Sequence, residues 1–374
     1  MAKALPEDQP GAPASDHVGE PGERFAAVTD PAFRTRELLE ALVAIPSVTG
    51  AEEDVVAFVE RRLQAAGWRC ESIPVSPGRR NLFASRGSLP RVVLSTHADT
   101  VPPYLLPRSE GGVLFARGAC DAKGSLAAMV VALEDLPLAT TGAGLLLLVG
   151  EERGSDGARA ANADSRPAEF LIGGEPTGNR FVGGSKGCVR IAIETRGVAA
   201  HSSLGAAGGA RSAIDPLLDF LAEIRAMDVP PDAIFGDTTV NIGVLEAGIA
   251  PNVIAESARA EILVRTGAST DAVLSKVEKA ARGRGEITVP YLSEKIVFGR
   301  PRGAPAGQIV SFACDLPLLD RWGIPLLVGP GEIAHAHAAD EQVELSAVEH
   351  AARLYRELVE GLLREGREFL DLPG

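Results

Sequence analysis

Residues 145–154, LLLLVGEERG, decide the fold class of this chain. The apolar run over residues 145–149 is typical of a strand buried on both faces of a sheet. It is far shorter than the roughly 20 residues that a membrane-spanning helix needs. Glu151 and Glu152 follow at once, and adjacent carboxylates at the end of a buried strand repel each other unless a cation lies beside them. The stretch therefore predicts a buried sheet with a charged site at a strand end, the alternative being two solvated glutamates.

Predicted helices and strands alternate on either side of this stretch. Apolar residues at helical spacing predict helices over residues 34–45, 52–66 and 124–136. Short apolar runs predict strands over residues 69–75, 81–85, 92–96, 145–149 and 170–173. This alternation predicts an α/β domain whose sheet is covered on both faces.

The pattern changes near residue 183. Half-exposed strands are predicted at 189–195, 239–245 and 258–264, with helices at 210–226 and 270–282, which fits a small α+β insert. The predicted elements then again resemble those of the buried α/β domain, with a strand at 324–328 and a helix at 346–365. We expect a discontinuous outer domain, residues 25–181 and 298–374, interrupted by an insert at 182–297. Residues 1–24, rich in proline, glycine and acids, are expected to be a disordered arm.

Composition narrows the class of protein. The chain has 374 residues, more than one compact core usually holds, and a net charge of −13. That acidic balance disfavours nucleic acid as a partner. The start lacks the apolar segment of a secretory signal, and no membrane partner is expected. The four cysteines lie far apart without a CxxC pair, which indicates free thiols and a cytoplasmic location.

Polar clusters follow the predicted strands, where open α/β sheets place their ligands. The first, STHADT at 95–100, sets His97 and Asp99 on the same side of the chain, so that Asp99 can orient a metal-binding imidazole. A purely structural His–Asp pair is the alternative. The second, ARGACDAKG at 116–124, contains Asp121, a candidate metal ligand. The alternative is that Asp121 caps the next helix. GEPT at 174–177 supplies Glu175.

A late segment, GPGEIAHAHAADE at 329–341, holds His335 and His337. For His17 and His350, solvated positions are expected. One early histidine, three carboxylates and a late histidine form a nitrogen and oxygen ligand set that suits zinc, cobalt or manganese. Five ligands exceed one tetrahedral ion with an open position but fit two ions with a bridging carboxylate. The spare carboxylate of the Glu151-Glu152 pair can then act as a general base.

The succession HADTVP, RGACDAKG, EE, GEPT, AHSS and GPGEIAHAHAADE resembles the dinuclear zinc metallopeptidase family. That family includes acetylornithine deacetylase, succinyl-diaminopimelate desuccinylase, aminoacylase and carboxypeptidase G, and the resemblance covers residues 35–370. It implies a zinc-dependent exopeptidase-like α/β domain with an inserted α+β dimerisation or lid domain. It also implies a homodimer that binds two divalent metal ions, with zinc as the first choice of metal and cobalt or manganese as the alternatives.

The resemblance implies a role for each motif residue. His97 and Glu175 would bind one metal, Glu152 and His337 the other, and Asp121 would bridge the two. Asp99 would orient His97, and Glu151 would be the general base. His337 is favoured over His335 as the last ligand, although two histidines two apart in a possible strand could both face the site.

The insert carries further matches. His201, in AHSS at 200–203, resembles the lid histidine that reaches the partner subunit's site and helps hold the oxyanion, although a lone loop histidine is more often on the surface. Asn252 and Arg265 resemble substrate contacts, and the fork of an arginine suits a carboxylate. A structural salt bridge is the alternative for Arg265. The chain departs from the family at Pro102-Pro103-Tyr104, where a longer loop is common, and at Leu263, where an Asp often stands.

The expected reaction is hydrolysis of the amide bond of an N-acyl amino acid, as in acetylornithine deacetylases. The alternatives are a dipeptidase or carboxypeptidase with the same metals, and a catalytically silent metal-binding protein. A complete ligand set together with Glu151 argues against the silent protein, because a site without turnover needs no base.

Overall fold

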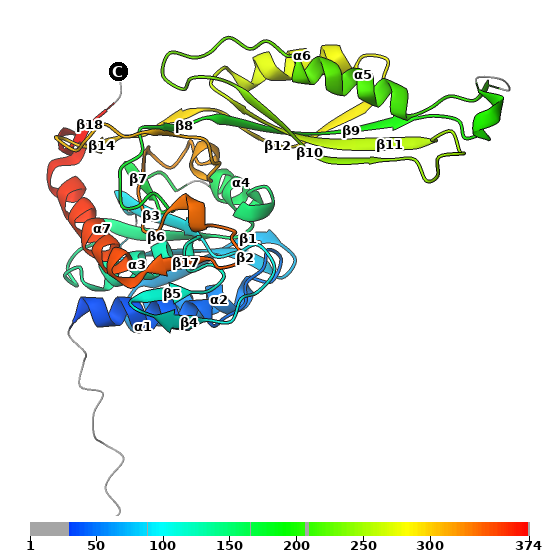
Figure 1. Ribbon diagram of the computed structural model, residues 1–374. Coiled ribbons are helices and arrows are strands. Elements are labelled where there is room, and N and C mark those ends of the chain that lie inside the picture. The colour runs from blue at the N-terminus through cyan, green and yellow to red at the C-terminus, as the bar shows by residue number, and fades with distance from the viewer. Residues whose placement is uncertain (1–29, 88, 165, 206–208, 373–374) are drawn as a thin grey trace, which may run out of the picture.

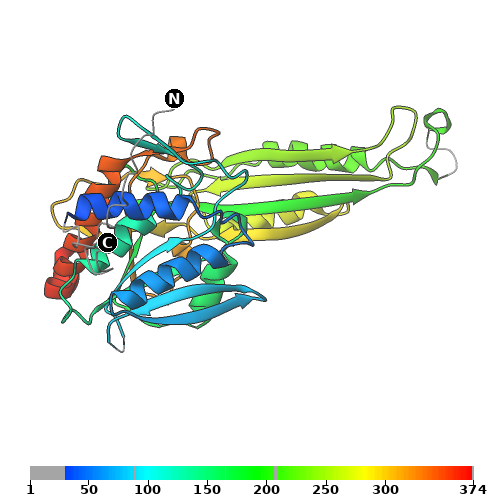
Figure 2. The ribbon, with the colours of Figure 1, turned by 90° about the horizontal axis from the view of Figure 1, so that it is seen from below.

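The computed structural model describes residues 30–372, apart from residues 88, 165 and 206–208. The arm expected over residues 1–24 lies outside the described residues. The described chain forms a larger α/β domain from which an elongated smaller domain projects to one side (Figures 1 and 2).

A six-stranded mixed sheet lies at the centre of the larger domain. Its strands, in spatial order, are β1 (Arg69–Ser76), β2 (Arg79–Ser85), β6 (Ala143–Leu148), β3 (Val92–His97), β7 (Phe170–Gly173) and β16 (Ile324–Leu327). The last four of these run parallel, whereas β2 is antiparallel to both β1 and β6. Since parallel strands end at the same edge, the loops after β3, β6, β7 and β16 are brought together.

Helices cover both faces of this sheet, as the sequence predicts. Leu145 and Leu147 of β6 face a core shared with four helices, α1 (Pro31–Val43), α2 (Glu53–Ala65), α3 (Lys123–Glu134) and α7 (Leu345–Glu365). Leu146 and Leu148 face the opposite core, which contains α4 (Asp156–Ala163) and Trp322. The alternation follows from the two-residue period of a strand. Because α3 is packed between helices and sheet, its first eleven residues are all buried.

The smaller domain is an antiparallel sheet with two helices on one face. Its strands, in spatial order, are β10 (Thr239–Ala247), β11 (Ser257–Thr266), β9 (Gly187–Arg196) and β12 (Glu286–Ser293). Helices α5 (Ile214–Arg225) and α6 (Thr270–Ala281) pack on the face that carries Val189, Ile191 and Ile193. Strand β10 lies at an edge of this sheet.

Short strands complete the described chain. They are β4 (Arg108–Glu110), β5 (Val113–Phe115), β8 (Gly184–Ser185), β13 (Ile296–Val297), β14 (Arg300–Pro301), β15 (Ile309–Val310), β17 (Gln342–Glu344) and β18 (Leu370–Asp371). Strand β8 pairs with β13 and β15 where the chain passes between the two domains. Among the described helices, none has the length and apolar character needed to cross a bilayer.

Most predicted elements agree with the structure to within about three residues, and three differences have physical reasons. Helix α5 begins at Ile214, four residues later than predicted. The reason is Pro216, because proline is tolerated in the first turn of a helix but not in its interior. Strand β12 was not predicted because Pro290 interrupts it, and the pairing with β9 shifts register at that point. Helix α4 was not predicted because it is short and composed largely of small residues.

Candidate metal centre and active site

Four loops at one edge of the central sheet carry the candidate residues. His97 ends β3 and is followed by Asp99, whereas Glu151 and Glu152 form a single turn after β6. Glu175 follows β7, and the segment with His337 follows β16. Asp121 immediately precedes α3, and the Asp121–Ala122 peptide is cis.

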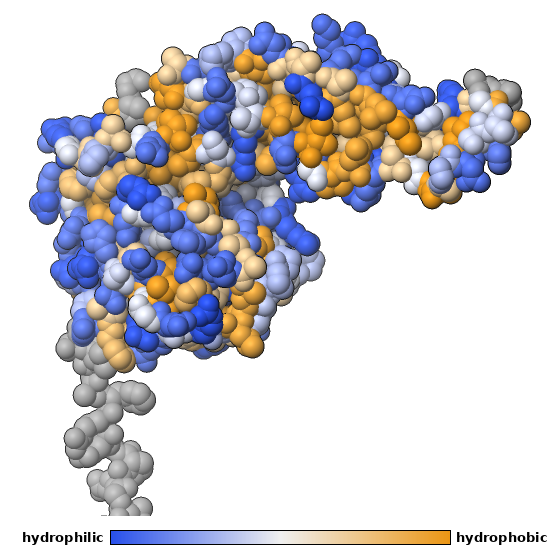
Figure 3. All heavy atoms as spheres, viewed as in Figure 1, coloured by the Kyte–Doolittle hydropathy of each residue, from blue (hydrophilic) through white to orange (hydrophobic). Residues whose placement is uncertain are grey.

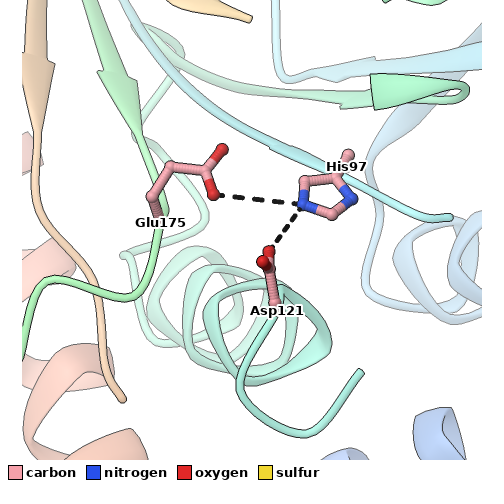
Figure 4. Close-up of side chains that lie close together, drawn as sticks. All are labelled: His97, Asp121 and Glu175. Carbon is pink, nitrogen blue, oxygen red and sulfur yellow. Dashed lines mark hydrogen bonds and ion pairs between the residues drawn. The ribbon is translucent and has the colours of Figure 1, made fainter. Parts of the chain in front are cut away.

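These side chains converge on Asp121. His97 Nε2 lies 3.0 Å from Asp121 Oδ1 and 4.0 Å from Glu175 Oε2 (Figure 4). On the other side, His337 Nε2 lies 3.4 Å from Asp121 Oδ2 and 2.9 Å from Glu152 Oε1. The two oxygens of Asp121 therefore face different histidines, as a bridging carboxylate would.

The donor set fits two divalent cations. His97, Asp121 and Glu175 offer ligand atoms within 4.8 Å of one another, and so do Asp121, Glu152 and His337. Imidazole and carboxylate donors suit zinc, cobalt or manganese, and two groups sharing one carboxylate match a two-metal arrangement. No thiolate lies in either group of ligand atoms, which distinguishes the cluster from a cysteine-rich structural zinc site.

The electrostatics of the cluster also indicate a need for cations. Burial raises the pKa of Glu151 and of Glu175 well above the usual range, and neighbouring carboxylates add to the effect. Hydrogen bonds with Asp121 and Glu152 raise the pKa of His337 to about 10. For Asp121, burial works in the opposite direction, but contacts with His337 and His97 still lower the pKa of the carboxyl. Buried carboxylates this close together are costly without positive charge beside them.

Asp99 connects the histidine loop to the glutamate turn. His97 Nδ1 lies 3.0 Å from the Asp99 carbonyl oxygen and 3.5 Å from its carboxylate, so Nδ1–H can donate and leave Nε2 for a metal. The carboxylate itself accepts the backbone N–H groups of Glu151 and Glu152, at 3.1 and 3.2 Å. Thr49, which the sequence analysis missed, donates its hydroxyl to the same carboxylate at 2.7 Å.

A second supporting carboxylate holds the Asp121 loop. Glu341 Oε1 accepts the backbone N–H groups of Cys120 and Asp121, and Glu341 Oε2 lies 2.6 Å from Arg117 Nη1. Both charged side chains are buried, Arg117 with 3% exposure and Glu341 with none. Both residues stand within the motifs 116–124 and 329–341, which is the signal that could have identified them.

The strand proposed for His335 and His337 is wrong. Residues Ile333–His335 form a short 3-10 helix, and His337 has a φ of 62°, so the two side chains diverge. His335 Nδ1 lies 3.4 Å from Gln342 Nε2 and lines a separate cavity. His337 is thus the histidine of this segment that joins the cluster.

Comparisons with known proteins agree with this geometry. Residues 183–288 match the family described as the peptidase dimerisation domain of M20 peptidases. A "probable carboxypeptidase" of Aspergillus clavatus is 35% identical over 364 residues, covering 86% of this chain and 87% of its own. A peptidase M20 domain-containing protein of Schizosaccharomyces pombe is 33% identical, covering 86% and 83%.

The chain belongs to the M20 peptidase family.

Solved structures share the M20 fold. A tripeptidase of Staphylococcus aureus superposes with a TM-score of 0.72 at 22% identity, covering 88% of this chain and 98% of its own. A Bacillus subtilis protein described as a dinuclear metal-binding M20 peptidase gives 0.63 at 16% identity, covering 89% and 99%. Family membership makes this M20 chain a metal-binding hydrolase of peptide or amide bonds.

A cavity of about 230 Å³, here called the catalytic cavity, opens from the cluster toward the small domain of the M20 chain. Arg190, Leu263 and Arg265 line its far wall. Arg190 is paired with Glu261 at 2.5 Å, whereas Arg265 Nη1 is buried without a hydrogen-bond partner among the described residues. Arg265 is therefore the arginine of this wall that has no carboxylate partner within the described part of the chain.

The other two lid candidates lie elsewhere. His201 is exposed and its Nδ1 contacts Ser203 Oγ at 2.8 Å. The backbone pairs His201 with Val253, which places Asn252 beside it. This segment follows the end of β9 where Arg196 pairs with Ser257, which is the end of the small domain remote from the central sheet (Figures 1 and 2). Within a single M20 chain, neither His201 nor Asn252 joins the cluster.

Proposed function

We propose that this protein is a metal-dependent carboxypeptidase or dipeptidase that releases the C-terminal residue of a short peptide or N-acyl amino acid. The observation that carries the proposal is Arg265, which lines the wall opposite the metal cluster and forms no ion pair among the described residues. A guanidinium in that position suits a free substrate carboxylate. The relatives named as probable carboxypeptidases support the same class of reaction.

In this proposal each member of the cluster has one task. His97 and Glu175 would hold one ion, Glu152 and His337 would hold the other, and Asp121, which lies between the two pairs, would be shared by both. Zinc is the first choice, with cobalt or manganese as alternatives. Bound ions would polarise the scissile carbonyl and acidify the attacking water. Asp99 keeps His97 and the glutamate turn in place.

Glu151 moves the proton. It lines the catalytic cavity next to Glu152, and its backbone N–H is held by Asp99. From there it can take a proton from the attacking water and pass it to the leaving amine. Burial raises the pKa of this carboxyl, and positive charge placed beside it would lower that pKa again.

The remote lid residues fit a homodimer. Apolar side chains gather on the small domain over α5 and the β10 side of the sheet (Figure 3), and Leu218 and Leu245 there are more than half exposed. An edge strand and apolar helix face of this kind suit a second copy of the chain. The partner's His201 and Asn252 would then complete the catalytic cavity, with His201 donating to the oxyanion.

Acetylornithine deacetylase-type cleavage is the second candidate, favoured by the motifs HADTVPP at 97–103 and GPGEIAHAHAADE at 329–341. Both candidates are tested by amine release from dipeptides, N-acetylornithine, other N-acetyl amino acids and N-succinyl-diaminopimelate. The enzyme is stripped of metal and reloaded with zinc or cobalt. Cleavage of dipeptides supports the first candidate, and cleavage of acetylated substrates alone supports the second. If two metals bind and no substrate is cleaved, both are wrong.

A further inference from the structure

A second cavity, of about 510 Å³, lies beside the metal cluster and has no part in the mechanism above. We call it the side cavity. Pro176, which directly follows Glu175, lines it, and so does Ile333, four residues before His337. The side cavity therefore begins next to residues that flank both halves of the cluster.

The catalytic cavity and the side cavity share two lining residues, Phe312 and Ile333. Ile333 keeps 44% of its surface exposed. Because the same two side chains line both cavities, the two cavities lie next to each other.

The lining of the side cavity is mostly apolar. Its apolar members include Phe181, Val182, Pro305, Val310 and Leu354. Its charged members, Arg180 and Glu332, pair with each other through two contacts of 3.0 and 2.8 Å.

The placement of charge sets the direction of the substrate. Arg265 lines the catalytic cavity without an ion-pair partner among the described residues, whereas Arg180 of the side cavity is already paired with Glu332. The carboxylate end of a substrate thus belongs near Arg265. The opposite end, on the acyl side of the scissile bond, is directed toward Ile333 and the side cavity.

We infer that the side cavity is a subsite for an apolar acyl group, so that the enzyme prefers substrates with a long or bulky apolar group on the acyl side. This inference rests on the proposed function, because it takes the scissile bond to lie at the metal cluster. The apolar group can be an aliphatic acyl chain or the side chain of an apolar N-terminal residue. Burial of each further methylene is expected to raise kcat/KM about two- to fourfold until the cavity is filled.

The test compares kcat/KM across two substrate series that share one C-terminal residue, using the metal-loaded full-length enzyme. One series carries acetyl, butanoyl, hexanoyl and octanoyl groups, and the other has Gly, Leu or Phe as the N-terminal residue. Ala306 and Gln308 are exposed residues of the side-cavity lining, so Ala306→Trp and Gln308→Trp can fill it without disturbing the core. Ala139→Trp, at an exposed loop position away from both cavities, is the matched control.

The wild type and Ala139→Trp should show the same rise with acyl size. In at least one of the two filling variants, the preference for the largest over the smallest acyl group should fall by about tenfold or more. The substrate series whose size preference falls more shows whether the natural apolar group is an acyl chain or the side chain of an N-terminal residue. A flat profile in the wild type, or an unchanged rise in both filling variants, would overturn the subsite. Failure to cleave any member of either series, with metal bound, would instead overturn the proposed function.

Discussion

At the scale of single residues, Asp121 joins the two halves of the candidate metal centre. Its two oxygens face His97 and His337, and its backbone N–H is held by the buried carboxylate of Glu341. Glu341 is in turn neutralised by Arg117. The geometry of the centre thus depends on a pair of residues that bind no metal themselves.

Removing the charge of Glu341 tests this dependence. Glu341→Gln leaves the Arg117 cation buried without a counter-charge, which should lower the free energy of unfolding by about 3–5 kcal/mol. Metal affinity should fall by about 10- to 100-fold, because the Asp121 loop is then held by a neutral amide oxygen in place of a carboxylate. Urea unfolding and competition with a chelator measure the two effects. Glu357→Gln, on the exposed side of α7, is the control, and equal behaviour of the two variants would contradict the supporting role.

Replacement of the proposed base separates catalysis from metal binding. Glu151→Gln should lower kcat by about 10²- to 10⁴-fold, because the attacking water loses its proton acceptor. The metal content, measured by mass spectrometry, should stay at the wild-type level. Glu37→Gln on the exposed face of α1 is the matched control. A purified Glu151→Gln enzyme with near-normal turnover would show that another group acts as the base.

The cysteines offer a prediction on reactivity. All four are free, and burial raises the pKa of each thiol, to about 11 for the half-buried Cys70. A raised pKa leaves little thiolate at pH 8, so the native protein should react slowly with a thiol reagent. Unfolding in guanidinium should expose four reactive thiols, counted by absorbance. Rapid titration of all four in the native state would contradict the burial described here.

At the scale of elements, the turn after β6 determines where Glu151 and Glu152 lie. Gly150 adopts a φ of 80°, which only glycine reaches without strain, and a side chain there would overlap the Asp156 carboxylate. The turn is then held on one side by Asp99. On the other side, buried Asn81 accepts the N–H of Val149 at 3.1 Å and donates to the Gly157 carbonyl at 2.8 Å.

Asn81 is therefore expected to tie β6 to α4. Asn81→Ala leaves two buried backbone groups without partners and should reduce the free energy of unfolding by about 1–3 kcal/mol. Equilibrium urea unfolding gives the value. Asn162→Ala removes hydrogen bonds of the same kind at the surface and should change it by less than about 0.5 kcal/mol. If the free energy of unfolding falls equally in both variants, the buried hydrogen bonds of Asn81 contribute no more to stability than the exposed ones of Asn162.

At the scale of the whole molecule, the small domain separates residues that the proposed mechanism needs together. Arg265 lies on the wall of the catalytic cavity of its own chain, whereas the segment with His201 and Asn252 lies at the remote end (Figure 2). In the proposed mechanism, a second chain brings that segment to the metal cluster. A complete site in this proposal thus combines residues of two copies.

Subunit mixing tests the shared site directly. Glu151→Ala and His201→Ala enzymes should each be nearly inactive while keeping their metals. After unfolding and refolding together, mixed dimers contain one site with Glu151 from one chain and His201 from the other. Activity should recover to about a quarter of the wild-type rate, as expected for random pairing of two copies. Each variant refolded alone is the control, and no recovery despite proven mixed dimers would place His201 outside the mechanism.

The elements of the fold could largely be predicted from the sequence, because the buried face of each helix or strand sets the spacing of apolar residues within that element. The apolar run over residues 145–149 predicts a buried strand, and β6 (Ala143–Leu148) is a strand with every residue buried. Prediction failed where contacts with residues distant in the chain outweigh the conformational preference of the local sequence. Pro290 disfavours a strand, yet pairing with β9 makes β12 one, and the alternation of His335 and His337 resembles a strand, yet the backbone turns between them.

The sequence by itself determined the class of the protein, the order of its elements and the residue types from which a metal site can be built. These depend on side-chain chemistry and on spacing along the chain. Only the tertiary structure decided that Asp121 lies between two histidines, that His335 does not join them, and that His201 is remote from its own cluster. The physical reason is that these are contacts between loops far apart in sequence. Their positions are set by the packing of whole strands and helices, which no local pattern encodes.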